Sequence, residues 1–178
     1  EVTEKMLADF LKERPTTVRC RQYMINQEVA IRSMEEQGVH VERAPYLDYA
    51  YYISGYDYLP AVESFFLGRI QPQDVSSMLV GEAADPEEGS YCIDLCAAPG
   101  GKSLHLADKL KGTGRVEARD VSQYKVELVR ENIERSGLEN IYARRKDALV
   151  MDPADREVAD LVLADVPCSG YGVIGHKT

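Results

Sequence analysis

The stretch Tyr91–Ser103, YCIDLCAAPGGKS, constrains the fold of this 178-residue chain more than any other. Residues 91–93 are typical of a short buried strand, a turn with one proline and two glycines follows, and residues 102–110 are typical of a helix. Adjacent glycines let the main chain adopt conformations barred to other residues and leave room for a ligand beside it. The unpaired N–H groups at the start of the helix favour a polar or anionic ligand. The stretch therefore predicts a ligand-binding turn, and a tight connection that binds no ligand is the alternative.

The second half of the chain alternates predicted strands with predicted helices. The strands are expected at 91–93, 115–119, 140–144 and 159–164, and the helices at 102–110 and 123–136. This alternation is typical of an α/β fold with a parallel sheet covered on both faces, whose ligands bind at the carboxyl ends of the strands. An acid stands at or just after the end of each strand, namely Asp94, Asp120, Asp147 and Asp165. A single such acid is commonly a helix cap, but four at one edge predict a ligand site.

The spacing of these residues narrows the choice of ligand. Asp120 lies 19 residues beyond Gly101, the spacing at which a carboxylate binds ribose hydroxyls in dinucleotide-type sites. The GxGxxG fingerprint is absent, and Cys96 stands where a phosphate loop ending in Gly-Lys-Ser would have its first glycine. A nucleoside triphosphate is therefore the disfavoured alternative. An adenosyl ligand without a pyrophosphate is predicted, and S-adenosylmethionine fits such a site.

The first half of the chain predicts a small α+β module. Residues 3–14 have the apolar spacing of an amphipathic helix, which Pro15 ends. Strands are expected at 16–20, 39–44 and 48–54, and a helix at 27–37. A strand, helix, strand, strand series of this size indicates a compact unit packed before the parallel sheet.

An acidic segment, residues 58–89, connects the two halves and contains one predicted helix at 75–84. We expect two units, residues 1–67 and residues 68–178.

Composition limits the class of protein. The net charge of −9 argues on its face against a nucleic-acid partner, because phosphate binding needs a basic surface. Its distribution weakens that objection, because the excess of acids lies outside residues 111–150. The local basic groups, Arg19 with Arg21 and the run at 144–146, are more typical of solvated faces than of binding sites. Four scattered cysteines without paired spacing predict neither a disulfide framework nor a metal site. We find no signal-peptide pattern and no apolar run of 18 residues, so we expect a soluble, cytoplasmic protein with no membrane partner.

The glycine-turn motif DLCAAPGGKS, taken together with ADVPCSGYGVIG at 164–175, resembles the Sun/Fmu-type (RsmB- and NSUN-like) RNA 5-methylcytosine methyltransferases. The resemblance is strong over residues 91–175 and weaker over 68–81. It implies the N-terminal part of a Rossmann-like class I methyltransferase sheet, preceded by a small RNA-binding-motif-like α+β subdomain. It also implies S-adenosylmethionine-dependent methylation of cytosine C5 in RNA, with ribosomal RNA as the expected substrate and transfer RNA as the alternative.

The resemblance also implies roles for individual residues. The turn would line the methionine end of S-adenosylmethionine, Asp120 would hold the ribose, Asp147 the adenine, and Asp165 would face the target cytosine. The expected cofactor-binding residues are Cys96, Ala97, Ala98, Pro99, Gly100, Gly101, Lys102, Asp120, Asp147 and Asp165. The expected catalytic residues are Cys168, Asp165 and Lys102. Cys168 would assist release of the covalent product.

The sequence departs from the family at the attacking thiol. Cytosine C5 is a poor nucleophile until a thiolate adds at C6, and in the family that cysteine belongs to a Thr-Cys motif beyond the Pro-Cys. The sequence ends at Thr178 without it. We therefore expect a fragment that does not turn over, with Cys168 as the alternative nucleophile by analogy with DNA cytosine methyltransferases. A catalytically inactive RNA-binding or assembly factor, favoured by the acidic charge, is the alternative from another class.

Overall fold

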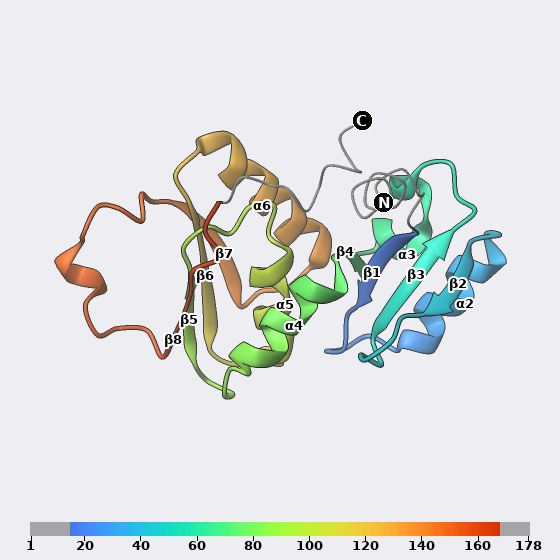
Figure 1. Cartoon of the computed structure of the whole chain (residues 1–178), viewed down its shortest axis with the longest axis horizontal. Coiled ribbons are helices and arrows are strands. Elements are labelled where there is room, and N and C mark those ends of the chain that lie inside the picture. The colour runs from blue at the N-terminus through green and yellow to red at the C-terminus, as the bar shows by residue number, and fades with distance from the viewer. Residues whose placement is uncertain (1–14, 168–178) are drawn as a thin grey trace, which may run out of the picture.

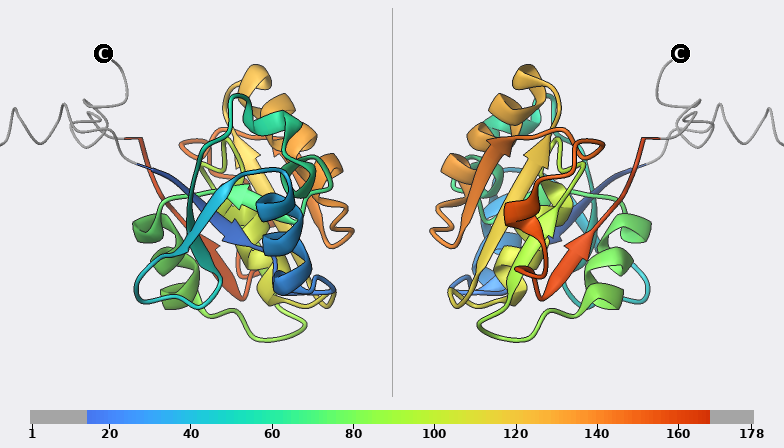
Figure 2. Two further views of the ribbon diagram at one scale, coloured as in Figure 1. Left: turned by 90° about the vertical axis from the view of Figure 1, so that its right-hand side faces the viewer. Right: turned by 90° about the vertical axis from the view of Figure 1, so that its left-hand side faces the viewer.

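The computed structural model describes residues 15–167, which form two four-stranded sheets with helices between and beside them. The sheet formed by the N-terminal half of the chain, called the front sheet here, is on the right in Figure 1, and the second sheet is on the left. Figure 2 shows the same arrangement from its two ends. The predicted helix at 3–14 lies outside the described residues.

The front sheet has the strand order β2-β3-β1-β4, and every pair in it is antiparallel. Its elements are β1 (Thr16–Cys20), α2 (Gln27–Glu36), β2 (His40–Arg43), β3 (Ala50–Ser54), the 3₁₀ turn η1 (Leu59–Ala61), α3 (Glu63–Phe66) and β4 (Ile70–Pro72). Alternate residues of β1 point to opposite faces, so Val18 and Cys20 pack against Ala30 and Met34 of α2. The opposite face is turned toward the rest of the molecule.

Strand β4 and helix α3 were not predicted. Both are very short, and β4 ends at Pro72, so neither carries a readable period. β4 pairs with β1, from Ile70 opposite Cys20 to Pro72 opposite Val18. The front sheet thus includes a strand that lies beyond the expected division between residues 67 and 68. The division itself stays a prediction.

The second sheet has the order β7-β6-β5-β8 and is entirely parallel. Its strands are β5 (Tyr91–Asp94), β6 (Arg115–Asp120), β7 (Ile141–Arg145) and β8 (Leu161–Leu163); the helices are α4 (Val75–Ala84), α5 (Gly101–Lys109) and α6 (Gln123–Ser136), and a 3₁₀ turn, η2, spans Pro153–Asp155. The bounds of α4 and α6 are those predicted, whereas β8 is shorter than the strand expected at 159–164. The parallel α/β sheet confirms the predicted Rossmann-like fold class.

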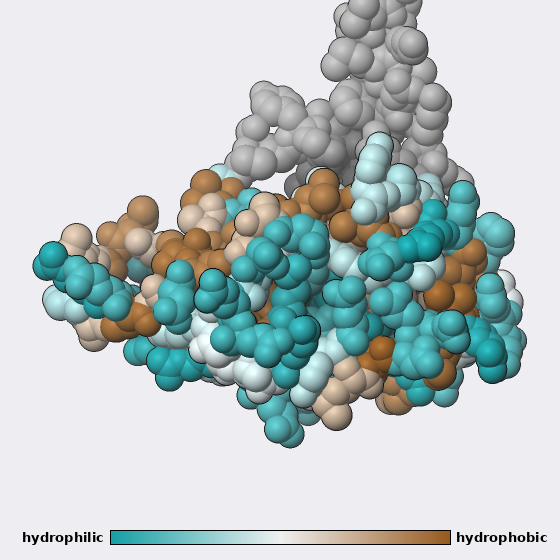
Figure 3. Space-filling view, turned by 90° about the horizontal axis from the view of Figure 1, so that it is seen from below, coloured by the Kyte–Doolittle hydropathy of each residue, from teal (hydrophilic) through white to brown (hydrophobic). Residues whose placement is uncertain are grey.

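The two faces of this sheet differ. Figure 1 shows α5 and α6 on the face turned toward the front sheet, while the segment after β7 projects from the other side with η2 at its tip. Helices on both faces were expected; within the described residues α5 and α6 cover one face only. The projecting segment carries the exposed side chains of Leu149, Val150 and Met151. Figure 3 shows hydrophilic groups over much of the surface seen from below, with hydrophobic groups in several separate places between them.

A buried ion pair joins the two halves. Arg19 of β1 and Asp108 of α5 are 1% and 2% exposed, and Nη1 of Arg19 lies 3.0 Å from Oδ2 of Asp108. Asp108 also accepts hydrogen bonds from the main-chain N–H groups of Gln22 (2.9 Å) and Tyr23 (3.1 Å). Nε of Arg19 donates to Oε1 of Gln73 at 3.0 Å. The basic pair Arg19 and Arg21, expected on a solvated face, is therefore buried at the junction of the sheets.

Helices α4 and α5 approach closely beside this pair. A Cβ atom at Gly81 would lie 2.3 Å from Nδ1 of His105, so only glycine fits there. The ring of His105 packs edge-on against Tyr49, with ring centroids 5.5 Å apart. Burial, with the nearby positive charges of Arg19 and Lys109, lowers the pKa of His105 to about 2. The imidazole is therefore a neutral packing group.

Replacing Asp108 with Asn tests the buried pair. The amide keeps the shape of the side chain but leaves the Arg19 charge buried without its partner. We expect the free energy of unfolding, measured by urea denaturation, to fall by roughly 3–5 kcal/mol. Glu88→Gln, which removes an exposed pair with Lys111 (2.9 Å), is the control and should leave it nearly unchanged. Equal small effects of the two substitutions would contradict this account.

Candidate functional site

The connection between β5 and α5 is a tight turn that depends on Gly100. This residue has φ 109°, in the region that favours glycine, and its N–H donates to the carbonyl of Ala97 at 2.7 Å. The N–H of Ala97 donates in turn to the carbonyl of Arg119 on β6 (2.8 Å), which anchors the turn to the sheet edge. A Cβ atom at Gly100 would lie 3.5 Å from Cγ1 of Val129, so α6 packs directly against the turn.

Asp94, the last residue of β5, closes this turn from inside. Its Oδ2 accepts a hydrogen bond from the hydroxyl of Ser103 at 2.6 Å, and its Oδ1 accepts one from the N–H of Cys96 at 3.3 Å. Burial raises the pKa of the Asp94 carboxyl, and the bonds from Ser103 and Cys96 and the charge of Lys102 oppose that rise. Asp94 thus holds the strand end and the first turn of the helix together.

A cavity of about 200 Å³ opens in front of the turn. Lys102 and Asp165 meet at its rim, with Nζ of the lysine 2.6 Å from Oδ2 of the carboxylate. Its lining comes from both halves of the chain: Pro72, Gln73, Asp74, Ser77, Asp94, Cys96, Ala97, Ala98, Pro99, Gly101, Lys102 and Asp165. The residues at 72–77 were not predicted to belong to the site. The mostly polar run Gln-Asp-Val-Ser-Ser at 73–77, which leads into the first turn of α4, was the available signal, but sequence alone does not place it beside the glycine turn.

Two further predicted residues lie at the same edge of the sheet. Asp120 ends β6, is 4% exposed, and accepts a hydrogen bond from the N–H of Ser122 at 3.3 Å. Asp147 follows β7 and accepts one from the N–H of Leu149 at 2.9 Å. The order β7-β6-β5-β8 puts the four acids side by side along the edge, as the sequence predicted.

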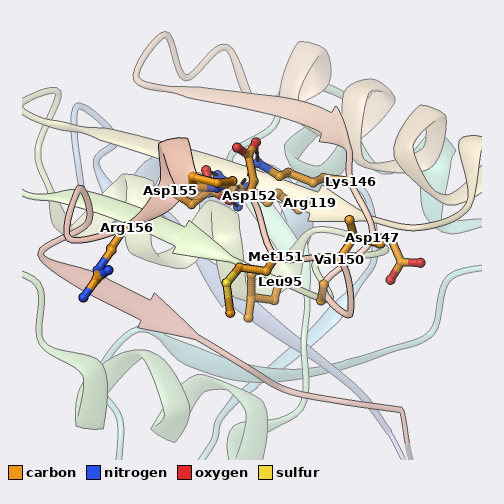
Figure 4. A pocket seen from close by; sticks show the side chains of 11 residues that line it. Leu95, Arg119, Lys146, Asp147, Val150, Met151, Asp152, Asp155 and Arg156 are labelled. Atoms are coloured by element: carbon orange, nitrogen blue, oxygen red, sulfur yellow. Dashed lines mark hydrogen bonds and ion pairs between the residues drawn. The ribbon is translucent and has the colours of Figure 1, made fainter.

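A second cavity, of about 670 Å³, is lined in part by Asp147, which does not line the cavity in front of the turn. Figure 4 shows the carboxylates of Asp152 and Asp155 turned toward Arg119 and Lys146, with Asp147 pointing away from them. Asp155 binds Arg119 through both oxygens, at 2.6 and 3.0 Å, and Lys146 at 2.7 Å. Hydrogen bonds from Arg119 and Lys146 lower the pKa of Asp155 to about 2. Four of the charged groups in this cavity, Arg119, Lys146, Asp152 and Asp155, are therefore paired among themselves.

Cys96 is the cysteine of the glycine turn. Cys96 lies half-buried in the turn, where burial and the carboxylates of Asp120 and Asp94 raise its pKa, so its thiol stays protonated. Cys168, the predicted catalytic cysteine, lies outside the described residues.

Among residues 15–167, no three His, Cys, Asp or Glu side chains come together as ligands for a metal ion. In the same range no helix is long and apolar enough to cross a membrane.

The family model described as 16S rRNA methyltransferase RsmB/F matches residues 82–178. The Bacillus subtilis protein named "Probable ribosomal RNA small subunit methyltransferase B" is 35% identical over 178 residues, which cover 99% of this chain and 40% of that protein. A Pyrococcus horikoshii tRNA (cytosine(72)-C(5))-methyltransferase is 35% identical over 115 residues, covering 65% of this chain and 29% of that protein. The chain thus spans two fifths or less of the length of these relatives.

A solved structure shows the same arrangement of both halves. The crystal structure of a methyltransferase homologue from Pyrococcus horikoshii matches 100% of this chain with a TM-score of 0.84 and 27% identity. The match covers 58% of that protein. Because it extends over the whole chain, the similarity includes the front sheet as well as the parallel sheet.

Replacing Ser103 with Ala tests how Asp94 is held. Loss of the hydroxyl removes a bond that opposes the effect of burial, so the pKa of Asp94, followed by NMR titration of its carboxyl carbon, should rise further. A carboxyl with a raised pKa contributes most to stability below its unfolded pKa of about 3.9 and loses that contribution as pH rises through the folded pKa. At pH 7 the variant should therefore lose about 1–3 kcal/mol of unfolding free energy.

The matched control is Ser122→Ala, at the end of the neighbouring strand, because that hydroxyl makes no capping hydrogen bond. An unchanged Asp94 pKa in Ser103→Ala would show that the Ser103 hydroxyl does not oppose the effect of burial.

Proposed function

The chain belongs to the 16S rRNA methyltransferase RsmB/F family, and on that premise we propose that it acts in the S-adenosylmethionine-dependent methylation of cytosine C5 in RNA. The membership bears out the predicted Sun/Fmu-type resemblance. The observation that carries the proposal is the glycine turn lying in one cavity with the Lys102–Asp165 pair, next to the acids that end the neighbouring strands. A cofactor turn and a base-facing carboxylate then lie within one site.

The residues around the turn fit S-adenosylmethionine by their chemistry. The first N–H groups of α5 have no partner within the helix, and with the Lys102 ammonium they suit the carboxylate of an amino acid. Carboxylates suit the remaining polar groups of the cofactor. Asp120 would bind the ribose hydroxyls and Asp147 the adenine amine. Residues 96–102 would line the methionine end. When bound, the cofactor supplies an electrophilic methyl group.

Asp165 and Lys102 are proposed to act on the base. Asp165 is exposed at the rim of the cavity, where its carboxylate can accept a hydrogen bond from the exocyclic amine of a cytosine. Lys102 holds that carboxylate at 2.6 Å and so fixes its direction. The base must leave its stack to reach this position. A thiolate that adds at C6 makes C5 nucleophilic, and Cys168, three residues beyond Asp165, is proposed to help release the covalent product.

The relatives point to the class of substrate. One is named as a ribosomal RNA methyltransferase and the other as a tRNA methyltransferase. We take ribosomal RNA as the substrate of this protein and transfer RNA as the alternative. Residues 1–67 would form the unit that binds RNA and residues 68–178 the cofactor-binding unit, in the cytoplasm.

Replacing Asp120 with Asn tests the cofactor site. The substitution preserves the size of the side chain but removes a charge that accepts two ribose hydroxyls. We expect the affinity for S-adenosylhomocysteine, measured by isothermal titration calorimetry, to fall by about tenfold to a hundredfold, because bonds to charged groups contribute about 1.5–3 kcal/mol. Glu131→Gln, an exposed acid on α6, is the control and should bind as the wild type does. Binding of ATP without binding of S-adenosylhomocysteine would refute the proposal.

Replacing Cys168 with Ala in the full-length protein tests the chemistry. If Cys168 releases the product, the variant should accumulate a covalent protein–RNA complex, visible as a band of reduced mobility in denaturing gels. Loss of any such complex would make Cys168 the nucleophile. S-adenosylhomocysteine binding without methyl transfer by the full-length wild type would favour the inactive RNA-binding or assembly factor.

A further inference from the structure

Asn132 of α6 makes a hydrogen bond to the glycine turn. Its Nδ2 donates to the carbonyl of Pro99 at 2.9 Å and also to the carbonyl of Leu128, four residues earlier on the same helix, at 3.1 Å. The second bond is local and common for asparagine in helices, but the first crosses to another element. Pro99 immediately precedes Gly100, so this bond fixes the direction of the peptide on which the left-handed glycine depends.

Arg135 holds the Asn132 amide in this orientation. Its Nη2 donates to Oδ1 of Asn132 at 2.9 Å. Because the carbonyl oxygen of the amide faces the guanidinium, the NH₂ group is directed to Pro99. Arg135 is a half-buried side chain on the same helix, one turn after Asn132.

Arg135 is itself held by the front sheet. Its Nη1 donates to the carbonyls of Phe65 (2.9 Å) and Ile70 (3.3 Å), and its Nη2 donates to the side-chain oxygen of Gln71. The guanidinium carbon also lies 4.0 Å from the centre of the Phe65 ring. A Cβ atom at Gly68 would lie 2.2 Å from the carbonyl oxygen of Arg135. Only glycine therefore allows the connection between α3 and β4 to lie this close to the end of α6.

We propose that Arg135 and Asn132 are positioning residues. They connect the α3–β4 segment to the glycine turn and hold the turn in the conformation that binds its ligand. The path runs from the carbonyls of Phe65 and Ile70 through the guanidinium and the amide to the carbonyl of Pro99. Neither side chain lines the cavity in front of the turn. The inference rests on the proposed function for the identity of the ligand, but the state of the turn is measurable without one.

The variant Asn132→Asp separates positioning from folding. Aspartate keeps the size of the side chain and its contact with Arg135 but cannot donate to Pro99. We expect the amide of Gly100 in the ligand-free chain to exchange with solvent about three to ten times faster, the range that one lost hydrogen bond accounts for. Affinity for S-adenosylhomocysteine should fall by a similar factor, while the melting temperature is kept. A merely structural role would instead lower the melting temperature and leave the turn as protected as before.

The variant Arg135→Lys tests whether the arginine acts through Asn132. Lysine keeps the charge but lacks the planar fork that reaches several acceptors at once. Alone it should accelerate Gly100 exchange and weaken ligand binding, and in combination with Asn132→Asp it should add nothing further. Arg130→Lys is the matched control, because Arg130 is exposed on the same helix and pairs with Glu127 at 2.7 Å.

The outcomes distinguish the two proposals. Wild-type exchange and wild-type affinity in Asn132→Asp would overturn the inference and leave the proposed function standing. Faster Gly100 exchange in a chain that binds no S-adenosylhomocysteine would support the positioning path and count against the proposed function. Additive effects of the two substitutions would overturn the role of Arg135.

Discussion

The structure depends on the carboxylate of Asp108, which binds a buried guanidinium and two main-chain N–H groups from the front half of the chain. Two charges removed from water require this degree of pairing, so the contact defines one relative placement of the two sheets. Asp108 stands on α5, the helix that starts at the glycine turn. The front sheet is therefore fixed to the element whose first residues face the ligand cavity.

The candidate site is for this reason a product of both halves. Gln73 and Asp74 reach the cavity from the end of the front sheet, and Asp165 reaches it from the last strand of the parallel sheet. The second contact region, around Arg135, binds the opposite side of the turn through α6. The turn is thus held between two contacts with the front sheet, one on each neighbouring helix.

Much of this architecture is readable from the sequence where a period or a cap exists. Local spacing predicts the glycine turn, the helices α4 and α6, and the four acids at the strand ends. Each of these depends on neighbours within one turn or one strand. The three-residue strand β4 carries no period. Arg19 resembles an ordinary surface cation in the sequence, since its partner Asp108 lies 89 residues away. Asn132 likewise reads as a polar helix residue until Pro99 is brought beside it. Long-range pairing, rather than residue type, separates what was predicted from what was not.

Only Gln73 and Asp74 stand between the end of β4 and the start of α4. Strand β4 of the front sheet therefore runs almost directly into α4, which packs against α5 and, through Val75 and Met78, against the front half of the chain. Independent modules are usually joined at an exposed linker that recombination between genes can cut without breaking an element. This chain offers no such point at that junction, so any exchange of the front sheet between related genes must carry β4 with it.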